Sequence, residues 1–222
     1  MIKRAITFGN YNTAAKGWTL TSWKLSDAVQ KTHYIDKPGG DGAWDFSTFL
    51  TQGVPRYSNR QLAAFFECSE GDRLSREALI RDMVNTLDGM EVDIYLPDDP
   101  YHYVRGLLHV AREYNDMVHA RVSVTATCEP WKYADKETNI TLTATTAKQT
   151  ATIINGGRRA VVPVLNVSGN GASVLLQYGL ASLALSAGTH RWPDLLLTPG
   201  SHDLTYSGSG SLVVTFREAV LE

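Results

Sequence analysis

The histidines and cysteines of this chain are the residues that could bind a metal or take part in acid–base chemistry. Its six histidines never occur at the His-x-x-x-His spacing, and its two cysteines, Cys68 and Cys128, do not form a Cys-x-x-Cys pair. Zinc sites in folded domains reuse such spacings because one helix or turn then presents two ligands to the same ion. The sequence therefore predicts no metal site and no cofactor.

Carboxylates gather around one glycine-rich segment, which contains Asp36, Asp41 and Asp45. Carboxylate oxygens bind calcium, but the alternating ligands and the closing glutamate of an EF-hand loop are missing here. Aspartate is also a preferred residue of turns, because its side chain accepts hydrogen bonds from nearby backbone amides. We interpret these three residues as turn and cap residues.

The segment Gly208-Ser209-Gly210 comes nearest to a serine-hydrolase motif. Such an enzyme needs Gly-x-Ser-x-Gly on a turn from a strand to a helix, whereas this segment lies between two predicted strands. A hairpin loop is expected, no catalytic residue is predicted, and the chain is predicted not to be an enzyme. A hydrolase with an unrecognised site stays open as an alternative, and it would need convergent titratable residues in a pocket.

A short segment rich in arginine has the chemistry of protein contacts. Arginine presents a planar set of donors to carboxylates and backbone carbonyls, and both arginine and tyrosine are enriched at interface hot spots. The candidate residues for contacts between subunits are Arg56, Tyr57, Asn59 and Arg60. Roles inside the domain are equally open, because Asn59 suits a turn cap and Arg60 could pair within its own domain.

Trp192 is the candidate for a sugar contact, because an aromatic ring can stack on the apolar face of a sugar. Its neighbour Pro193 and the apolar residues 195–197 favour a place in the core or a plug at the sheet edge. A lectin-like fold confers no site by itself, so sugar binding is not the favoured prediction.

Length and composition limit the class of protein. The chain has 222 residues, of which 43% are hydrophobic, and a formal net charge of −2 at pH 7. This is the composition of a globular protein and excludes wholesale disorder. It lacks the basic excess that neutralises nucleic-acid phosphates, so no nucleic-acid binding is expected. The short basic groups Arg158-Arg159 and Arg73/Arg76/Arg81 are expected on solvated faces.

The chain begins Met1-Ile2-Lys3-Arg4 and continues without an apolar stretch. We therefore expect no signal peptide, and folding in a cytoplasm. No apolar run is long enough to cross a bilayer, so membrane insertion is not expected.

Alternation of apolar and polar residues dominates the first half of the chain, most clearly at 61–68, 92–96 and 118–128. Successive side chains of a strand point to opposite faces, so each segment is predicted to be a strand that covers a core on one side. Cys68 and Cys128 fall on the apolar faces and are expected to pack as small hydrophobic residues, although a disulfide stays open.

One segment has helical spacing instead. Its apolar positions are Leu79, Ile80, Met83, Val84 and Leu87. Ser75 is the expected N-cap, Glu77 suits the positive first turn, and Gly89 can end the helix in a left-handed conformation.

Composition changes near residues 131–137, after which short alternating strands are separated by glycine-rich turn signals at 155–157, 168–171 and 207–210. Short strands at regular spacing are typical of a sandwich. The predicted fold is therefore mainly β. An N-terminal, sandwich-like domain with one α-helix occupies residues 1–132, and a C-terminal β-sandwich occupies residues 133–222.

Several motifs together resemble the distal tail proteins of phages with long, non-contractile tails. The turn motif consists of Pro38, Gly39, Gly40, Asp41 and Gly42. An aromatic–Asp pair at 44–45 and the Tyr-x-Asn-Arg motif at 57–60 follow, with further pieces at 8–13 and 100–106. The order and spacing of these pieces carry the resemblance. Residues 192–195, 198–204 and 213–217 are similar to the galectin-like second domain of the same family.

The resemblance implies a structural virion protein, assembled in the bacterial host cytoplasm and located at the distal end of the tail. The N-terminal domains would form a hexameric ring between the tail-tube protein and the tail-tip, or tail-associated, protein. The galectin-like domains would project outward and could carry receptor-binding proteins. A carbohydrate-binding, lectin-like adhesion module is the alternative function.

Overall fold

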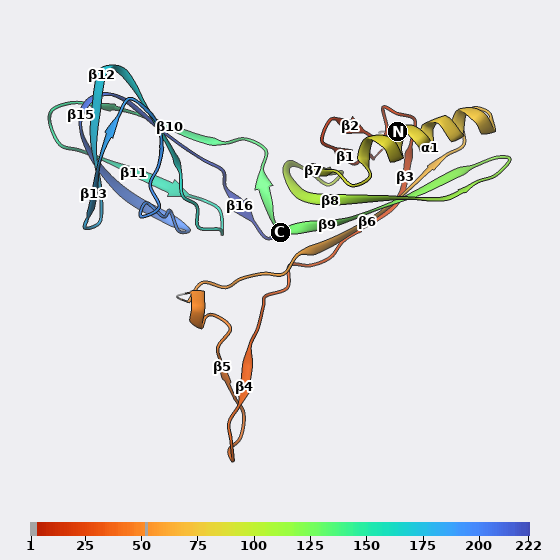
Figure 1. Cartoon of the computed structure of the whole chain (residues 1–222), viewed down its shortest axis with the longest axis horizontal. Coiled ribbons are helices and arrows are strands. Elements are labelled where there is room, and N and C mark those ends of the chain that lie inside the picture. Colours follow the sequence, from red (N-terminus) through yellow and green to blue (C-terminus); the bar gives the residue numbers. More distant parts are fainter. Residues whose placement is uncertain (1–3, 52) are drawn as a thin grey trace. The chain divides into compact units, whose positions relative to one another are not determined.

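The computed structural model of the chain describes residues 4–51 and 53–222, which divide into two compact units, Met1–Lys132 and Tyr133–Glu222 (Figure 1). The expectation that the chain has no signal peptide rests partly on residues 1–3. These lie outside the described residues. Among the residues that are described, no helix is both long enough and apolar enough to cross a membrane.

The first unit contains α1 (Arg73–Leu87), a short 3-10 helix (Phe49–Thr51) and the strands β1 (Thr7–Phe8), β2 (Tyr11–Asn12), β3 (Thr19–Leu25), β4 (Tyr34–Asp36), β5 (Ala43–Asp45), β6 (Arg60–Cys68), β7 (Glu91–Leu96), β8 (Asp99–Asn115) and most of β9 (Ala120–Ala134). The second unit contains β10 (Thr138–Ala144), β11 (Gln149–Asn155), β12 (Val164–Tyr178), β13 (Ala181–Ser186), β14 (Gly188–Arg191), β15 (Gly200–Phe216) and β16 (Ala219–Val220). The predicted fold class, mainly β with one helix in the described residues and curled antiparallel sheets, is confirmed.

The sheet of the first unit has the strand order β2-β1-β7-β8-β9-β6-β3. Within it β6 pairs antiparallel with β9, in a register that places Arg60 opposite Cys128 and Cys68 opposite Ala120. Burial alternates along β6, as the period-two pattern predicts, and the buried face joins one core with α1. Both cysteines are free and buried in this core, which settles the open disulfide.

Helix α1 packs on this core through Ile80, Met83 and Leu87, which confirms the predicted apolar stripe. Ser75 as the N-cap is wrong. The cap is Asp72, whose carboxylate accepts a hydrogen bond of 2.8 Å from the Ser75 amide. Aspartate is among the strongest N-caps, and the helix therefore begins earlier than its apolar stripe. Glu77 consequently lies beyond the first turn. Gly89 has a φ of 74°, the predicted left-handed conformation.

In the second unit the two long strands, β12 and β15, each belong to two layers, because each half of the strand pairs with a different neighbour. Residues 164–167 of β12 pair with β14, while residues 173–178 pair with β13. Likewise β15 pairs with β11 through residues 200–206 and with β10 through residues 210–216. Both strands bend between these halves, and one core of residues from both halves lies between the two layers.

The predicted turns at 168–171 and 207–210 are therefore wrong, because both segments lie inside strands that continue through them. They are the bends at which β12 and β15 pass from one layer to the other, and the register of the pair shifts between Ser168 and Ser173. Gly208 and Gly210 have φ values of 131° and 105°, which other residues rarely adopt. The predicted hairpin loop at Ser209 is thus a strand bend.

Candidate assembly interface

The segment between β3 and β6, residues 26–59, forms a two-branched extension that we call the arm (Figure 1). Its branches run antiparallel from the sheet onward. The Lys31 amide donates to the Arg56 carbonyl, and the Ser58 amide donates to the Val29 carbonyl, each at 2.8 Å. The arm therefore continues the β3–β6 pairing and ends in the β4–β5 hairpin.

The glycine motif that resembles the phage family makes the turn of this hairpin. Pro38, Gly39, Gly40, Asp41 and Gly42 lie between β4 and β5. Gly39 and Gly42 have φ values of 68° and 77°, so the turn needs glycine at both positions. The Lys37 amide donates to the Gly42 carbonyl at 3.2 Å and closes the turn.

Polar contacts hold the other end of the β4–β5 hairpin together. The His33 amide donates to the Ser47 hydroxyl, and the Ser47 amide donates to the Asp45 carboxylate, both at 2.8 Å. The hydrogen bonds from Ser47 hold the pKa of Asp45 below its usual range. Asp45 is thus a turn-type residue. In the part of the chain that the structure describes, no three His, Cys, Asp or Glu side chains come together as a metal site.

The arm displays apolar side chains, and none of its described residues, 26–51 and 53–59, is buried. Every residue from 31 to 46 is exposed. Large hydrophobic residues that the arm exposes are Val29, Tyr34, Ile35, Trp44, Phe46, Phe49, Leu50 and Val54. Phe49 is 73% exposed and Leu50 is 91% exposed. Two of these rings, Phe46 and Phe49, pack edge-on against each other with centroids 5.8 Å apart.

The four candidate contact residues lie where the arm joins β6, which we call the arm root, and they differ in burial. Arg56 and Asn59 are exposed, and Tyr57 packs edge-on against Trp131 with ring centroids 5.4 Å apart. Arg60 is only 2% exposed, and its Nε donates to the Ser26 carbonyl at 2.6 Å. This hydrogen bond fixes the two branches of the arm to each other where they leave the sheet.

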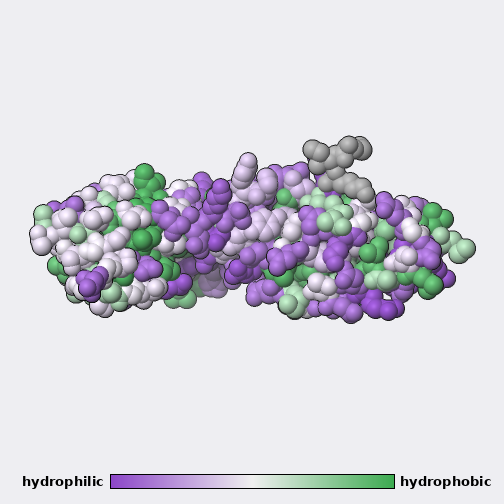
Figure 2. Space-filling view, turned by 90° about the horizontal axis from the view of Figure 1, so that it is seen from above, coloured by the Kyte–Doolittle hydropathy of each residue, from purple (hydrophilic) through white to green (hydrophobic). Residues whose placement is uncertain are grey.

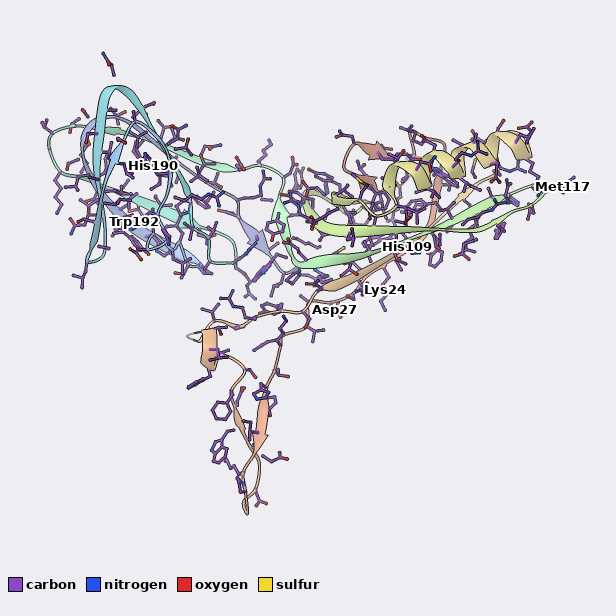
Figure 3. All side chains as sticks on the ribbon, viewed as in Figure 1. Lys24, Asp27, His109, Met117, His190 and Trp192 are labelled. Carbon is purple, nitrogen blue, oxygen red and sulfur yellow. The ribbon has the colours of Figure 1, made fainter. Side chains whose placement is uncertain are left out.

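Trp192, the sugar candidate, is 6% exposed and belongs to the core of the second unit with Leu195 and Leu197 (Figure 3). Its Nε1 donates to the Asp194 carboxylate at 3.1 Å. A ring held in this way presents no open face on which a sugar could stack.

Sequence reasoning missed a second buried arginine. Arg76, expected on a solvated face, is 2% exposed, which makes that expectation wrong. Its guanidinium donates to the carbonyls of Gly71 at 2.7 Å and of Asp116 and Met117 at 3.0 Å each. Three carbonyls accept from the two terminal nitrogens of this buried guanidinium, while its Nε is buried without a hydrogen-bond partner. Two of the carbonyls come from a distant hairpin that no local pattern reveals.

No protein-family model matches the sequence, and the comparison with curated proteins gives no match. Among solved structures, the chain is similar to the Dit protein (gp 19.1) of phage SPP1, described as a paradigm of the hub adsorption apparatus in phages that infect Gram-positive bacteria. The TM-score is 0.67 at 13% sequence identity, and the match covers 96% of this chain and 98% of that one. The two chains share their fold along nearly their whole length.

Proposed function

We propose that this chain is a structural component of the tail tip of a long-tailed phage. Six copies form a ring through their first units, and the ring joins the tail tube to the adsorption apparatus. The arm is the observation that carries the proposal, because its apolar side chains need a partner to cover them. The shared fold with a phage hub protein supports the same role.

The arm has the properties of an element that is completed by assembly. Its β4–β5 hairpin is a two-stranded sheet, and such hairpins are marginally stable alone in water. Its exposed rings, Tyr34, Trp44 and Phe49, are of the types enriched in interface cores. Binding to a neighbouring subunit would bury these rings and order the hairpin at the same time.

A ring follows when the arm of each copy binds a different surface on the next copy. Such a head-to-tail contact closes into a cycle when its rotation fits, and it leaves every arm covered. Arg56 and Asn59, exposed at the arm root, are the polar residues proposed to contact the neighbour. Arg60 and Tyr57 position the arm.

The remaining partners follow from the same proposal. One face of the ring binds the tail-tube protein, and the other binds the tail-tip protein. The second unit serves as a galectin-like domain that projects outward and carries receptor-binding proteins. The chain is then a virion protein at the distal end of the tail, with a structural and not an enzymatic role.

The molar mass of the purified protein tests the ring. We expect six chains of 24.4 kDa, or twelve where two rings pair, by size-exclusion chromatography with light scattering. The double variant Phe49→Ser, Leu50→Ser should shift this mass towards the monomer, because it removes two exposed apolar side chains of the arm. Its circular dichroism should be unchanged, since neither residue belongs to the core.

Leu180→Ser is the matched control, because Leu180 is fully exposed in a turn of the second unit, outside the arm. It should keep the assembled mass. A wild-type protein that is monomeric at its highest soluble concentration would refute the ring. An arm variant that assembles as well as Leu180→Ser would refute the role of the arm.

A further inference from the structure

The chain contains two Asn-Gly pairs, Asn155-Gly156 and Asn170-Gly171. This dipeptide is prone to spontaneous deamidation, because glycine has no Cβ to keep its backbone amide away from the preceding asparagine side chain. The sequence alone gives both pairs the same reactivity. Both lie in the second unit, where the structure places them in opposite environments.

The first pair is buried, and both of its reacting groups are held by hydrogen bonds. Asn155 is 1% exposed, and its Nδ2 donates to the carbonyls of Arg159 and Leu197 at 2.9 Å each. The Gly156 amide, which would have to attack the asparagine side chain, donates instead to the Glu218 carboxylate at 3.1 Å. Ring closure at this pair would have to break these hydrogen bonds inside the fold.

The second pair lies at the bend of β12, outside the strand pairing. The β12–β15 register shifts between Ser168 and Ser173, and the described residues 169–172 have no partner in it or in the registers with β13 and β14. Asn170 and Gly171 are both exposed. Within the described part of the chain, no other residue forms a hydrogen bond with the Asn170 side chain. Residues that leave a strand ladder in this way are held less firmly than paired ones.

We propose that Asn170 is a deamidation site of the native protein and that Asn155 is protected from the same reaction. The Gly171 amide nitrogen attacks the side-chain carbonyl carbon of Asn170, and a new C–N bond closes a succinimide ring. The side-chain nitrogen takes up the Gly171 amide proton through solvent and leaves as ammonia. Water then opens the ring at either carbonyl, which leaves aspartate or isoaspartate at position 170.

The reaction changes both the charge and the backbone of the second unit. Either product adds one negative charge to a chain whose formal net charge is already −2 at pH 7. Much of the surface of the second unit is pale in Figure 2, the colour of weakly polar residues, so a new carboxylate stands out on it. Isoaspartate also adds a methylene to the backbone of the bend. There is little room for it, because a Cβ on Gly169 would lie 3.3 Å from the Gly210 Cα.

Peptide mapping of the full-length protein tests the proposal, because trypsin separates the two pairs into the peptides 149–158 and 160–191. The native protein is incubated for several days at mildly alkaline pH, digested, and compared by mass spectrometry with a sample that was not incubated. The peptide 160–191 should gain about 1 Da, the difference between an amide and a carboxyl group. The gain should be at least about tenfold faster than in the peptide 149–158, because Asn155 reacts only after local opening. Fragment ions should place the change at Asn170.

Two controls assign the difference to the fold and to this residue. Incubation of the full-length chain in denaturant should largely remove the difference between the two peptides, because both pairs are then equally accessible. Asn170→Gln should abolish the mass gain of the peptide 160–191, since its longer side chain would have to close a larger ring much more slowly. The site is exposed, so this variant should keep the circular dichroism of the wild type.

Several outcomes would overturn the proposal. Equal rates in the two native peptides would show that the fold does not protect Asn155. A mass gain that fragment ions place at Asn166, in the same peptide, or that persists in Asn170→Gln, would refute Asn170 as the site. So would a native protein in which the peptide 160–191 gains no mass while the denatured chain converts. This inference does not depend on the proposed ring, which the molar mass tests separately.

Discussion

Two buried arginines, Arg60 and Arg76, show how far single residues can be understood from sequence. Each side chain is 2% exposed and donates to backbone carbonyls. The bonded carbonyls lie 34 residues away for Arg60 and up to 41 residues away for Arg76. Residue type alone favours an exposed or interfacial arginine, because the acceptors that permit burial come from other strands and loops. Glycine positions in turns, by contrast, depend on local backbone geometry, and Gly89 was predictable for that reason.

Arg60→Met should destabilise the first unit by roughly 2–3 kcal/mol, because the Ser26 carbonyl at the arm root loses a charged donor. Unfolding in urea, followed by circular dichroism, measures the loss. Arg56→Met is the matched control on the exposed side of the same root, and its free energy of unfolding should stay within about 0.5 kcal/mol of wild type. An Arg60→Met protein of wild-type stability with a lower assembled mass would instead make Arg60 a contact between subunits.

At the scale of elements, the spacing of apolar residues predicted the strands and the helix that bury only one face. β6 alternates in burial along its length, and α1 buries one stripe, so the sequence pattern and the structure agree there. The glycine-rich stretches of β12 and β15 have the same local composition as turns. They are strand bends instead, because β12 and β15 stay paired with each other on both sides of these stretches. That pairing involves residues about forty positions apart, which no local signal reports.

Gly208→Ala should therefore be one of the most damaging small substitutions in the second unit. A Cβ at this position would lie 2.0 Å from the Ser173 carbonyl oxygen, and the φ of 131° disfavours any side chain. We expect a loss of about 3 kcal/mol or more from strain and overpacking together. Chemical denaturation of the full chain provides the measurement.

Gly179→Ala is the control for the backbone effect alone. Gly179 also has a positive φ, 58°, but a Cβ there would meet no atom within 4 Å. Its cost should stay near 1 kcal/mol, the strain of a left-handed residue. Equal losses at the two positions would show that the close approach of β12 and β15 is not what requires glycine.

For the molecule as a whole, the two units have separate hydrophobic cores. The exposed apolar side chains of the arm, which carry the proposed function, belong to the first unit. The change in amino-acid composition near residue 132 could indicate a domain boundary. It could not show that the described residues of the arm are all outside a core, because exposed and buried aromatic residues look alike in a single sequence. The structure makes that distinction, and the distinction points to assembly.

Separate cores predict two unfolding transitions, because each compact unit of this size tends to unfold cooperatively on its own. In scanning calorimetry of the full-length chain, Arg60→Met should lower the temperature of one transition and Gly208→Ala that of the other. Each variant serves as the control for its partner, since their sites lie in different units. A single transition that both variants shift by similar amounts would mean that the two cores unfold as one cooperative structure, and that the second unit is not an independent domain.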